Sequence, residues 1–358
     1  MTDLTIAQQR LINQRLTGIP FEKPADVVNG LVAVQAQDYA GAKWALGQRL
    51  QDAHDADLDR AFNAGDILRT HVMRPTWHFV TPADIRWLLA LTAPRVHAVS
   101  AAMYRRLELD SATFKRCHKV LIKALRDGQT LTREELSTAL QEAGIVISSG
   151  QRLAYIIMQA ELEALICSGP RRGKQFTYAL LDERAPAAKH LKPDEALAEL
   201  AQRYFASHGP ATARDFAKWS GLGSTAAKRG LASVTAQLQH QTINGGDYWF
   251  APISSSAPPL SPTAYLLSIY DEYIIGYKDR SMLANPEVIG MLFTMGGALS
   301  YLLVLDGQIV GTFRRTLSKD TVTITIESAA PLTKAQMRAV AAAAQRYGEF
   351  LQKSVVLA

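Results

Sequence analysis

The sequence predicts an α+β protein that consists of three tandem winged-helix motifs followed by a C-terminal β-meander with a packed helix. Two observations predict this class. Helices followed by a short hairpin, which is the order of a winged-helix unit, occur three times before residue 252. Farther along, alternating strands on both sides of Asp306 and Gly307 lead into one long helix. The three units repeat a pattern of elements and not a sequence.

The first unit is predicted within residues 1–90. Residues 5–16 have roughly helical apolar spacing, a second apolar run covers 27–34, and residues 57–64 indicate another short helix. The period then changes in ILRTHVMRPTWHFV (67–80), where two short β-branched and aromatic runs predict a hairpin with a tight turn.

The second unit is predicted within residues 91–184, after connecting helices. TREELSTALQEAG (132–144) indicates a helix with a threonine N-cap followed by glutamate, and residues 149–169 indicate a longer helix. GKQFTYALL (173–181) then predicts the strands of the wing. The order of elements in the first unit therefore occurs again.

The third unit is predicted within residues 185–252. Amphipathic runs indicate helices at 194–209, 211–222 and 224–234. Strands are predicted within residues 235–252, so this unit also ends in a hairpin.

A C-terminal α+β domain is predicted within residues 253–358. Pro- and Ser-rich residues 252–262 indicate a linker. Residues 298–316 predict a hairpin, residues 322–328 a third strand, and residues 334–352 a long closing helix.

Composition and charge restrict the class of protein. Cys117 and Cys167 each occupy a helical-looking stretch without a CxxC partner, so we interpret them as buried thiols and expect no zinc or other cofactor. The N-terminus lacks the apolar core of a signal peptide, and no apolar run is long enough to span a bilayer. We therefore expect a cytoplasmic, nucleoid-associated protein without membrane contact. A formal charge of +6 and a pI of about 9.2 favour a polyanionic partner.

Common catalytic motifs are absent from the sequence. It contains no phosphate loop, dinucleotide fingerprint, HExxH or GxSxG motif. The segment HGPAT (208–212) is interpreted as a helix stop followed by an N-cap and not as a site.

The first candidate site is Gln35-Ala36-Gln37, which the pattern places at the C-terminal end of an apolar helix. Glutamines at i and i+2 point apart on a helix but converge on an extended backbone. A carboxamide is no general base near neutral pH, yet it accepts a hydrogen bond from water while it donates another. Gln35 and Gln37 are therefore candidate catalytic residues for a reaction that needs a positioned water. The motif alone is weak and favours the alternative, two capping or core-edge glutamines.

The predicted hairpin supplies a second group of candidates. On its first strand Arg69 and His71 share one face, and on its second strand His78 lies on the face opposite Trp77. We expect Arg69, His71, Arg74 and His78 to contact DNA near a damaged nucleotide. The alternative, which the residues support equally, is that the histidines are structural.

A third group lies within YDEYIIGYKDR (270–280). Asp271 and Glu272 form a carboxylate pair suited to acid–base work or to stabilising a cationic intermediate. The alternative is that they form ion pairs with Lys278 and Arg280 and so hold a loop. We expect Lys278 and Arg280 to contact DNA.

A basic turn, SGPRRGK (168–174), lies between the second helix of the second unit and its wing. Its cations suit phosphate contacts, which position a protein on DNA without reading sequence. Arg171, Arg172 and Lys174 are therefore expected to bind DNA, and the alternative is a solvated basic turn.

Four segments together resemble the AlkZ-type DNA glycosylases, within the winged-helix DNA-binding family. They are AVQAQDY (33–39), RTHVMRPTWHFV (69–80), HGPATARDFAKWSGL (208–222) and YDEYIIGYKDR (270–280). The segments occur in the order of the family, and the resemblance covers nearly the whole chain.

The resemblance implies a monomeric, C-shaped protein whose concave face binds double-stranded DNA. It implies a monofunctional glycosylase for alkylated purines, including bulky N7 adducts and interstrand crosslinks. The catalytic Q-x-Q or Q-x-D motif of the family matches Gln35 and Gln37, which places this chain nearer the Q-x-Q branch, tied to crosslink unhooking. Asp38 follows one residue too late to be the acid of a Q-x-D motif.

Two other classes of protein fit the predicted units. One is a winged-helix transcription regulator, although regulators are usually dimers with a single such motif. The other is a non-catalytic protein that binds lesions. Retained lesion affinity without base release would favour the lesion binder, and a footprint at one palindromic operator would favour the regulator.

Overall fold

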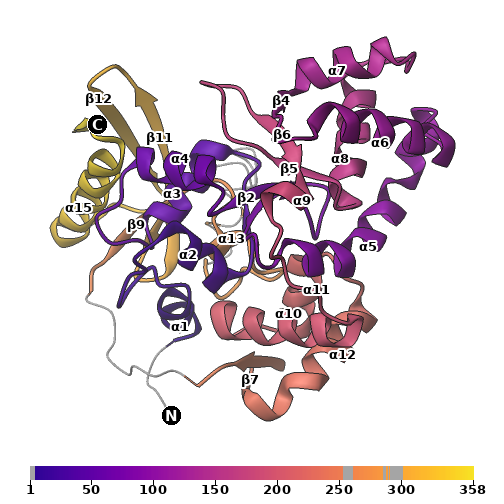
Figure 1. Cartoon of the computed structure of the whole chain (residues 1–358). Coiled ribbons are helices and arrows are strands. Elements are labelled where there is room, and N and C mark those ends of the chain that lie inside the picture. The colour runs from indigo at the N-terminus through magenta and orange to yellow at the C-terminus, as the bar shows by residue number, and fades with distance from the viewer. Residues whose placement is uncertain (1–4, 253–260, 285–287, 289, 291–300) are drawn as a thin grey trace.

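A computed structural model describes residues 5–252, 261–284, 288, 290 and 301–358 of the chain (Figure 1). Most of the predicted linker at 252–262 lies outside the described residues, so that prediction is not examined by the structure. Within the described residues, no helix combines the length and the apolar composition that a membrane span requires.

The first unit consists of helices that surround a small antiparallel sheet of order β1-β3-β2. Its elements are α1 (Ile6–Asn13), α2 (Pro24–Leu31), β1 (Val34–Gln35), α3 (Tyr39–Gly47), α4 (Asp55–Ala64), β2 (Leu68–His71) and β3 (Trp77–Val80). The hairpin predicted at 67–80 is confirmed as β2 and β3. One prediction is wrong: Gln35 lies on a strand and not at the end of a helix, because α2 ends at Leu31 and the following backbone pairs with β3.

The second unit repeats this arrangement after the long connecting helix α5 (Ile85–Arg106). Its elements are α6 (Ser111–Leu125), β4 (Leu131–Thr132), α7 (Arg133–Glu142), α8 (Gly150–Leu162), β5 (Ile166–Ser168), β6 (Thr177–Leu180) and α9 (Leu181–Arg184). The sheet order is β4-β6-β5, so the first strand again pairs with the last. Thr132 caps α7 in a capping box with Glu135, as predicted. Cys167, expected in a helix, lies instead on β5, because α8 ends at Leu162.

The third unit follows the same order. Its elements are α10 (Pro193–His208), α11 (Ala213–Ser220), α12 (Ser224–Val234), the short 3-10 helix η1 (Thr235–Gln237), β7 (Gln239–Ile243) and β8 (Gly246–Phe250). A bridge between Ala211 and Trp249 takes the place of the first strand. The predicted helix stop and N-cap are confirmed, since α10 ends at His208 and Thr212 caps α11.

The C-terminal part contains a five-stranded sheet of order β13-β12-β11-β10-β9. Its elements are β9 (Ala264–Leu267), α13 (Glu272–Ile275), β10 (Tyr301–Leu305), β11 (Gln308–Leu317), β12 (Thr321–Ser328), α15 (Lys334–Leu351) and β13 (Ser354–Leu357). Asp306 and Gly307 have φ angles of 49° and 86°, the left-handed conformation that a two-residue hairpin turn requires. The predicted meander is confirmed, but two unpredicted strands extend it, with β13 parallel to β12.

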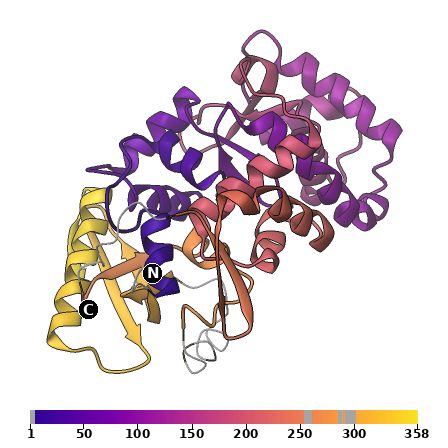
Figure 2. The same ribbon diagram turned by 90° about the horizontal axis from the view of Figure 1, so that it is seen from below.

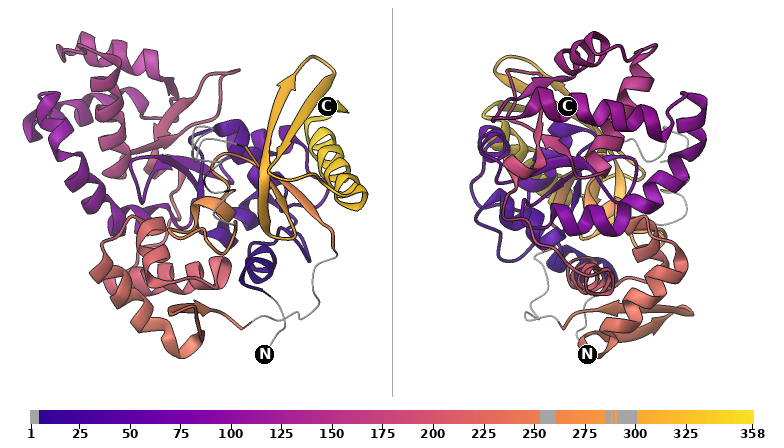
Figure 3. Two further views of the ribbon diagram at one scale, coloured as in Figure 1. Left: turned by 180° about the vertical axis from the view of Figure 1, so that it is seen from behind. Right: turned by 45° about the vertical axis from the view of Figure 1, so that its right-hand side comes forward.

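The C-terminal sheet and the first unit share one hydrophobic core, and part of the second unit forms a core of its own. A third core joins residues from all three units and the C-terminal part. Trp44 of α3 packs against Tyr347 of α15 with ring centroids 4.7 Å apart, and its indole N–H donates to the carbonyl of Leu266 on β9. The sheet and the second unit lie on opposite sides of the first unit, which therefore occupies the middle of the molecule (Figures 2 and 3).

Candidate active site and nucleic-acid interface

The backbone of Gln35 is held between two parts of the fold that are distant in sequence. On one side β1 pairs with β3, which places Gln35 opposite His78. On the other side the main-chain N–H of Gln35 donates to Oε1 of Glu272 at 3.0 Å. Val32, just before the strand, has a φ angle of 71°, which is strained for a β-branched residue. The extended geometry at Gln35 is thus imposed by tertiary contacts.

The side chain of Gln35 is buried and oriented by Arg74. Only 8% of Gln35 is exposed, and its Oε1 accepts a hydrogen bond from Nη2 of Arg74 at 2.9 Å. The same Nη2 lies 3.0 Å from Nε2 of His78, and Nη1 of Arg74 donates to the carbonyl of Trp219 on α11. One guanidinium therefore joins β1, β3 and the third unit.

His78 is a neutral acceptor in this cluster. Burial, followed by the positive charge of Arg74, lowers the pKa of His78 to about 3. Nδ1 of His78 lies 2.9 Å from the carbonyl of Thr76, which only a protonated Nδ1 can use, so Nε2 keeps its lone pair for Arg74. With 1% of its surface exposed, His78 lies beneath the surface, and DNA contact by this residue stays a prediction.

Glu272 is a completely buried carboxylate at the base of the cluster. It accepts hydrogen bonds from the Trp219 indole at 2.7 Å and from His208 at 3.3 Å, in addition to Gln35. Burial alone raises the pKa of Glu272, but the hydrogen bond from His208 and the charge of Arg74 outweigh it and hold the pKa below its usual value. Glu272 is therefore an anion enclosed by donors.

Gln37 lies beyond the end of β1 and is exposed. Its Oε1 accepts a hydrogen bond from the main-chain N–H of Trp77 at 3.4 Å, and the N–H of Ala36 donates to the carbonyl of Trp77 at 2.7 Å. The motif thus presents one buried amide, Gln35, and one amide accessible to solvent, Gln37. The accessible amide is the one suited to hold a water molecule or a substrate.

Arg69 supports the motif from the side of the second unit. Its Nε donates to the carbonyl of Ala36 at 3.0 Å, and its guanidinium lies over the rings of Trp77 at 4.2 Å and Phe176 at 4.5 Å. Burial lowers the pKa of Arg69 to about 10, which leaves the cation intact at neutral pH. His71 pairs with Trp77 across the hairpin, so the face that carries Arg69 and His71 also carries Trp77.

His71 is held by a carboxylate of the second unit. Its Nδ1 contacts Oε2 of Glu161, and 7% of His71 is exposed. The contact with Glu161 therefore supports the alternative that His71 is structural. DNA contact by His71 stays a prediction.

The basic turn at 168–174 has two paired cations and one unpaired cation. Nη1 of Arg171 lies 3.2 Å from Asp59, and Nη1 of Arg172 lies 2.6 Å from Glu135. Lys174 is exposed; its carbonyl accepts a hydrogen bond from Nη2 of Arg171 at 3.1 Å, but its ammonium group has no hydrogen-bond or ion-pair partner among the residues that the structure describes. Of the three predicted phosphate contacts, Lys174 is the one whose charge is available without breaking an ion pair.

The carboxylates of the 270–280 segment find partners elsewhere in the fold. Asp271 forms a buried ion pair with Arg49 at 2.8 Å, and Glu272 contacts His208. The interpretation that they pair with Lys278 and Arg280 is therefore wrong, because the chain folds their side chains toward α3 and α10.

The two cations of this segment remain near the surface. Lys278 is exposed, and Arg280 is half-buried with its Nε 3.3 Å from the carbonyl of Ile274. Sequence analysis missed a third cation, Lys218 of α11, whose Nζ donates to the carbonyls of Ile275 and Tyr277 at 2.6 and 3.3 Å. Burial, followed by the charges of Arg74 and Arg280, lowers the pKa of Lys218 to about 8.

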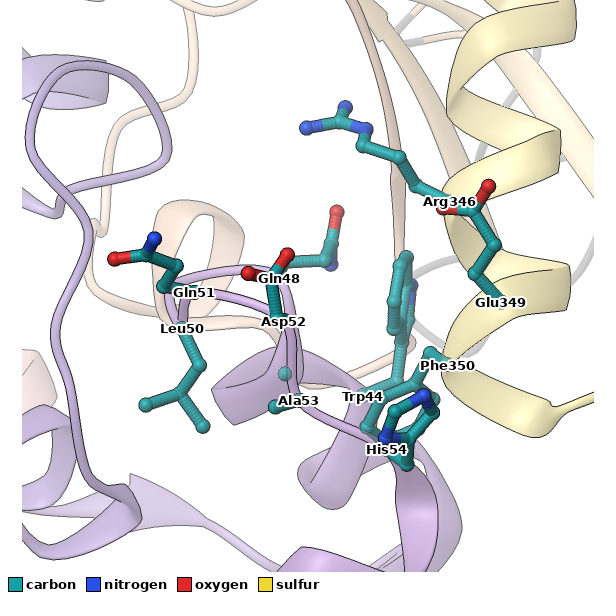
Figure 4. A pocket seen from close by; sticks show the side chains of 11 residues that line it. Trp44, Gln48, Leu50, Gln51, Asp52, Ala53, His54, Arg346, Glu349 and Phe350 are labelled. Atoms are coloured by element: carbon teal, nitrogen blue, oxygen red, sulfur yellow. The ribbon is translucent and has the colours of Figure 1, made fainter.

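A cavity of about 450 Å³ lies away from this cluster, between the loop after α3 and helix α15. Arg346 and Glu349 of α15 line one side of it, and Gln48 and Gln51 of the loop line another (Figure 4). Neither Gln35 nor Gln37 lines this cavity. In the described part of the chain, no group of three or more His, Cys, Asp or Glu side chains is placed to hold a metal ion.

The fold and site define a class of protein that has been seen before. A solved structure, DNA glycosylase AlkZ from Streptomyces sahachiroi, is similar over 99% of this chain and 98% of its own, with a TM-score of 0.81 and 22% sequence identity. The chain has that fold. A family model described as DNA glycosylase AlkZ-like matches residues 28–350. The chain belongs to the AlkZ-like DNA glycosylase family, as the resemblance implied.

A curated relative extends the comparison. It is an interstrand DNA cross-link repair glycosylase from Streptomyces sahachiroi, 27% identical over 312 residues that make up 81% of each chain.

Proposed function

We propose that this protein is a monofunctional DNA glycosylase of the Q-x-Q branch. It hydrolyses the N-glycosidic bond of N7-alkylated purines in double-stranded DNA and unhooks interstrand crosslinks. The family of the chain and its similarity to an interstrand DNA cross-link repair glycosylase support this proposal. The observation that carries it is the arrangement of Gln35 and Gln37, one amide fixed by Arg74 and the other open to solvent.

The chemistry requires little acid or base catalysis. An N7-alkylpurine is cationic and already a good leaving group, so the enzyme has to stabilise an oxocarbenium-like sugar and place a water molecule. We assign the water to Gln37, whose amide accepts and donates at once, and we assign to Gln35 either support of that water or contact with the sugar. The carboxylate of Glu272, buried behind Gln35, adds negative charge beneath the developing cation.

The units that present this site are proposed to be winged-helix motifs. In the first two, a strand precedes two helices and pairs with the last strand of a hairpin, which is the order of such motifs. We divide the chain into a first unit at 1–90, a second at 91–184, a third at 185–252 and a C-terminal domain at 253–358. A C-shaped, monomeric protein with a concave DNA face would reach a bulky lesion without base flipping, which a crosslink would block.

The test is base release from defined duplexes. Wild-type protein is expected to release N7-methylguanine and to unhook a nitrogen-mustard crosslink, detected as abasic sites cleaved by heat or alkali. The Gln35→Ala and Gln37→Ala proteins are expected to bind the same duplexes but to release base far more slowly. Unchanged release by both variants would remove the catalytic assignment, and lesion binding without release by wild type would leave a lesion-binding protein.

A further inference from the structure

A second cavity, of about 390 Å³, lies beside the Q-x-Q segment, between the first and second units. Its wall includes Arg69, Trp77, Phe176 and Tyr178, and Arg133 and Lys174 also line it. The volume lies in the range of about 300–1,000 Å³ typical of small-ligand pockets. Two wall residues hold the catalytic segment, since Trp77 donates to Gln37 and Arg69 donates to Ala36. Two residues of the cavity wall therefore also support the Q-x-Q segment.

Arg69 carries donors that the protein leaves unused. Its Nε is bonded to Ala36, but its two terminal nitrogens have no hydrogen-bond partner, and no carboxylate lies within ion-pair distance, among the described residues. Only 8% of Arg69 is exposed, but its two terminal nitrogens keep some solvent-accessible surface. Arg69 lines the cavity, so a ligand bound there could accept hydrogen bonds from these donors.

Burying an unpaired cation is costly, and the aromatic rings of Trp77 and Phe176 offset that cost only in part. The nearby carboxylate, Glu161, is occupied by His71. An anion within the cavity would complete the environment of Arg69. A planar guanidinium fork matches a phosphate in geometry.

The charge and shape of the cavity point to more than a simple anion. Arg69, Arg133 and Lys174 supply three positive charges against one carboxylate, Glu134. Trp77, Phe176 and Tyr178 provide an apolar wall that inorganic phosphate would not use but that a sugar and a base would contact. We propose that the cavity binds one nucleotide unit of DNA other than the lesion itself, with its phosphate on Arg69 and its sugar and base against the aromatic wall. This inference rests on the proposed function, because it takes DNA as the substrate.

Calorimetric titration of the intact protein tests the inference with three probes: a deoxynucleoside 5′-monophosphate, the deoxynucleoside without phosphate, and inorganic phosphate. The monophosphate is expected to bind at least about tenfold more tightly than either fragment. Arg69→Lys keeps the charge but loses the fork, and Phe176→Leu keeps an apolar side chain but loses the ring. Each is expected to weaken the monophosphate by roughly tenfold or more.

Lys174→Ala and Lys115→Ala form a matched pair. Both lysines are exposed, but Lys115 lies on α6 and does not line the cavity. Lys174→Ala is expected to weaken the monophosphate severalfold, and Lys115→Ala to leave its affinity unchanged. Thermal unfolding of every variant identifies loss of folding, and Lys174→Ala tests the site even if Arg69→Lys does not fold.

Several outcomes would overturn the inference: equal affinity for inorganic phosphate and the monophosphate, no effect of Phe176→Leu and Lys174→Ala, or an equal effect of Lys115→Ala. The binding measurement needs no glycosylase activity. A protein that releases base but shows none of this selectivity contradicts only the nucleotide site. A protein that binds the monophosphate as expected but never releases base contradicts only the proposed function.

Discussion

The carboxylate of Glu272 accepts a hydrogen bond from the main-chain N–H of Gln35 at 3.0 Å, across 237 residues of sequence. The bond ties the C-terminal part of the chain to the short strand that carries the first glutamine. The same carboxylate receives the indole N–H of Trp219 from the third unit. Glu272 therefore links the main chain at Gln35 to the third unit and to the C-terminal part of the fold. Changes to Glu272 should affect both catalysis and folding.

Glu272→Gln tests this dependence. The new side chain keeps its size, but its amide group must direct N–H donors at neighbours that are themselves donors. We expect a loss of about 1.5–3 kcal/mol in the free energy of unfolding, the usual cost of a charged hydrogen bond. We also expect slower single-turnover release of N7-methylguanine at a temperature where the variant is fully folded. Reduced stability with unchanged release would show that Glu272 supports the fold only.

The histidines of the cluster make stability depend on pH. Burial lowers the pKa of His78 to about 3 from 6.5, and it also lowers the pKa of His208. Because the unfolded state binds the proton more readily, acid favours unfolding. The contribution of His78 to stability is therefore complete above pH 6.5 and declines as the pH falls toward 3, by up to about 1.4 kcal/mol per pH unit for one proton.

Urea unfolding between pH 7.5 and 5 measures this effect. His78→Asn cannot take up that proton, and it should lose less stability over this interval than wild type. Parallel pH curves for the two proteins would contradict the assignment of His78 as a neutral acceptor.

The Arg74→Lys variant tests whether the site needs the geometry of the guanidinium group or only its positive charge. The guanidinium contacts Gln35, His78 and the carbonyl of Trp219 together, whereas one ammonium cannot reproduce that fork. We expect base release to slow by roughly ten- to a hundredfold, because Gln35 loses its fixed orientation, with little change in affinity for undamaged duplex. Arg86→Lys, at a surface ion pair with Asp182, is the control and should leave release unchanged.

Local sequence patterns predicted most elements of the fold but not the contacts that build the site. The helix at 334–352 and the turn at Asp306 and Gly307 depend on neighbouring residues, and both were predicted. The strand at Gln35 has two residues, too few for any period, and it exists because β3 pairs with it. No short-range pattern carries that information.

The buried carboxylates illustrate the same limit. Asp271 and Glu272 were singled out from composition, but their partners lie 222 and 64 residues away, at Arg49 and His208. Their nearest cations in sequence, Lys278 and Arg280, are not those partners. Proximity along the chain favoured the wrong ion pairs, because the side chains of Asp271 and Glu272 are buried in the protein interior.

The salt dependence of DNA binding should distinguish paired from unpaired cations. A cation that contacts phosphate contributes about 0.9 to the slope of log affinity against log salt concentration. Lys174→Ala and Lys278→Ala should each lower the slope by about that amount, since both side chains are exposed. Arg172→Ala should lower it less, because Arg172 is already paired with Glu135. Equal slopes for wild type and Lys174→Ala would remove Lys174 from the interface.

Borohydride trapping tests the proposal that the glycosylase is monofunctional. Lys218 is the residue whose reactivity would contradict that proposal. A glycosylase that also cleaves the strand forms a Schiff base through an amine, and Lys218 has the pKa, about 8, that such a nucleophile needs. Its ammonium nevertheless donates to two backbone carbonyls, of Ile275 and Tyr277, which engage the nitrogen within the protein. We therefore expect no covalent protein–DNA product with borohydride at pH 7 or 8.5, while base release continues. A covalent product that is trapped with the wild-type protein but not with Lys218→Met would replace the water mechanism with an amine mechanism. Lys23→Met, at an exposed lysine before α2, is the matched control.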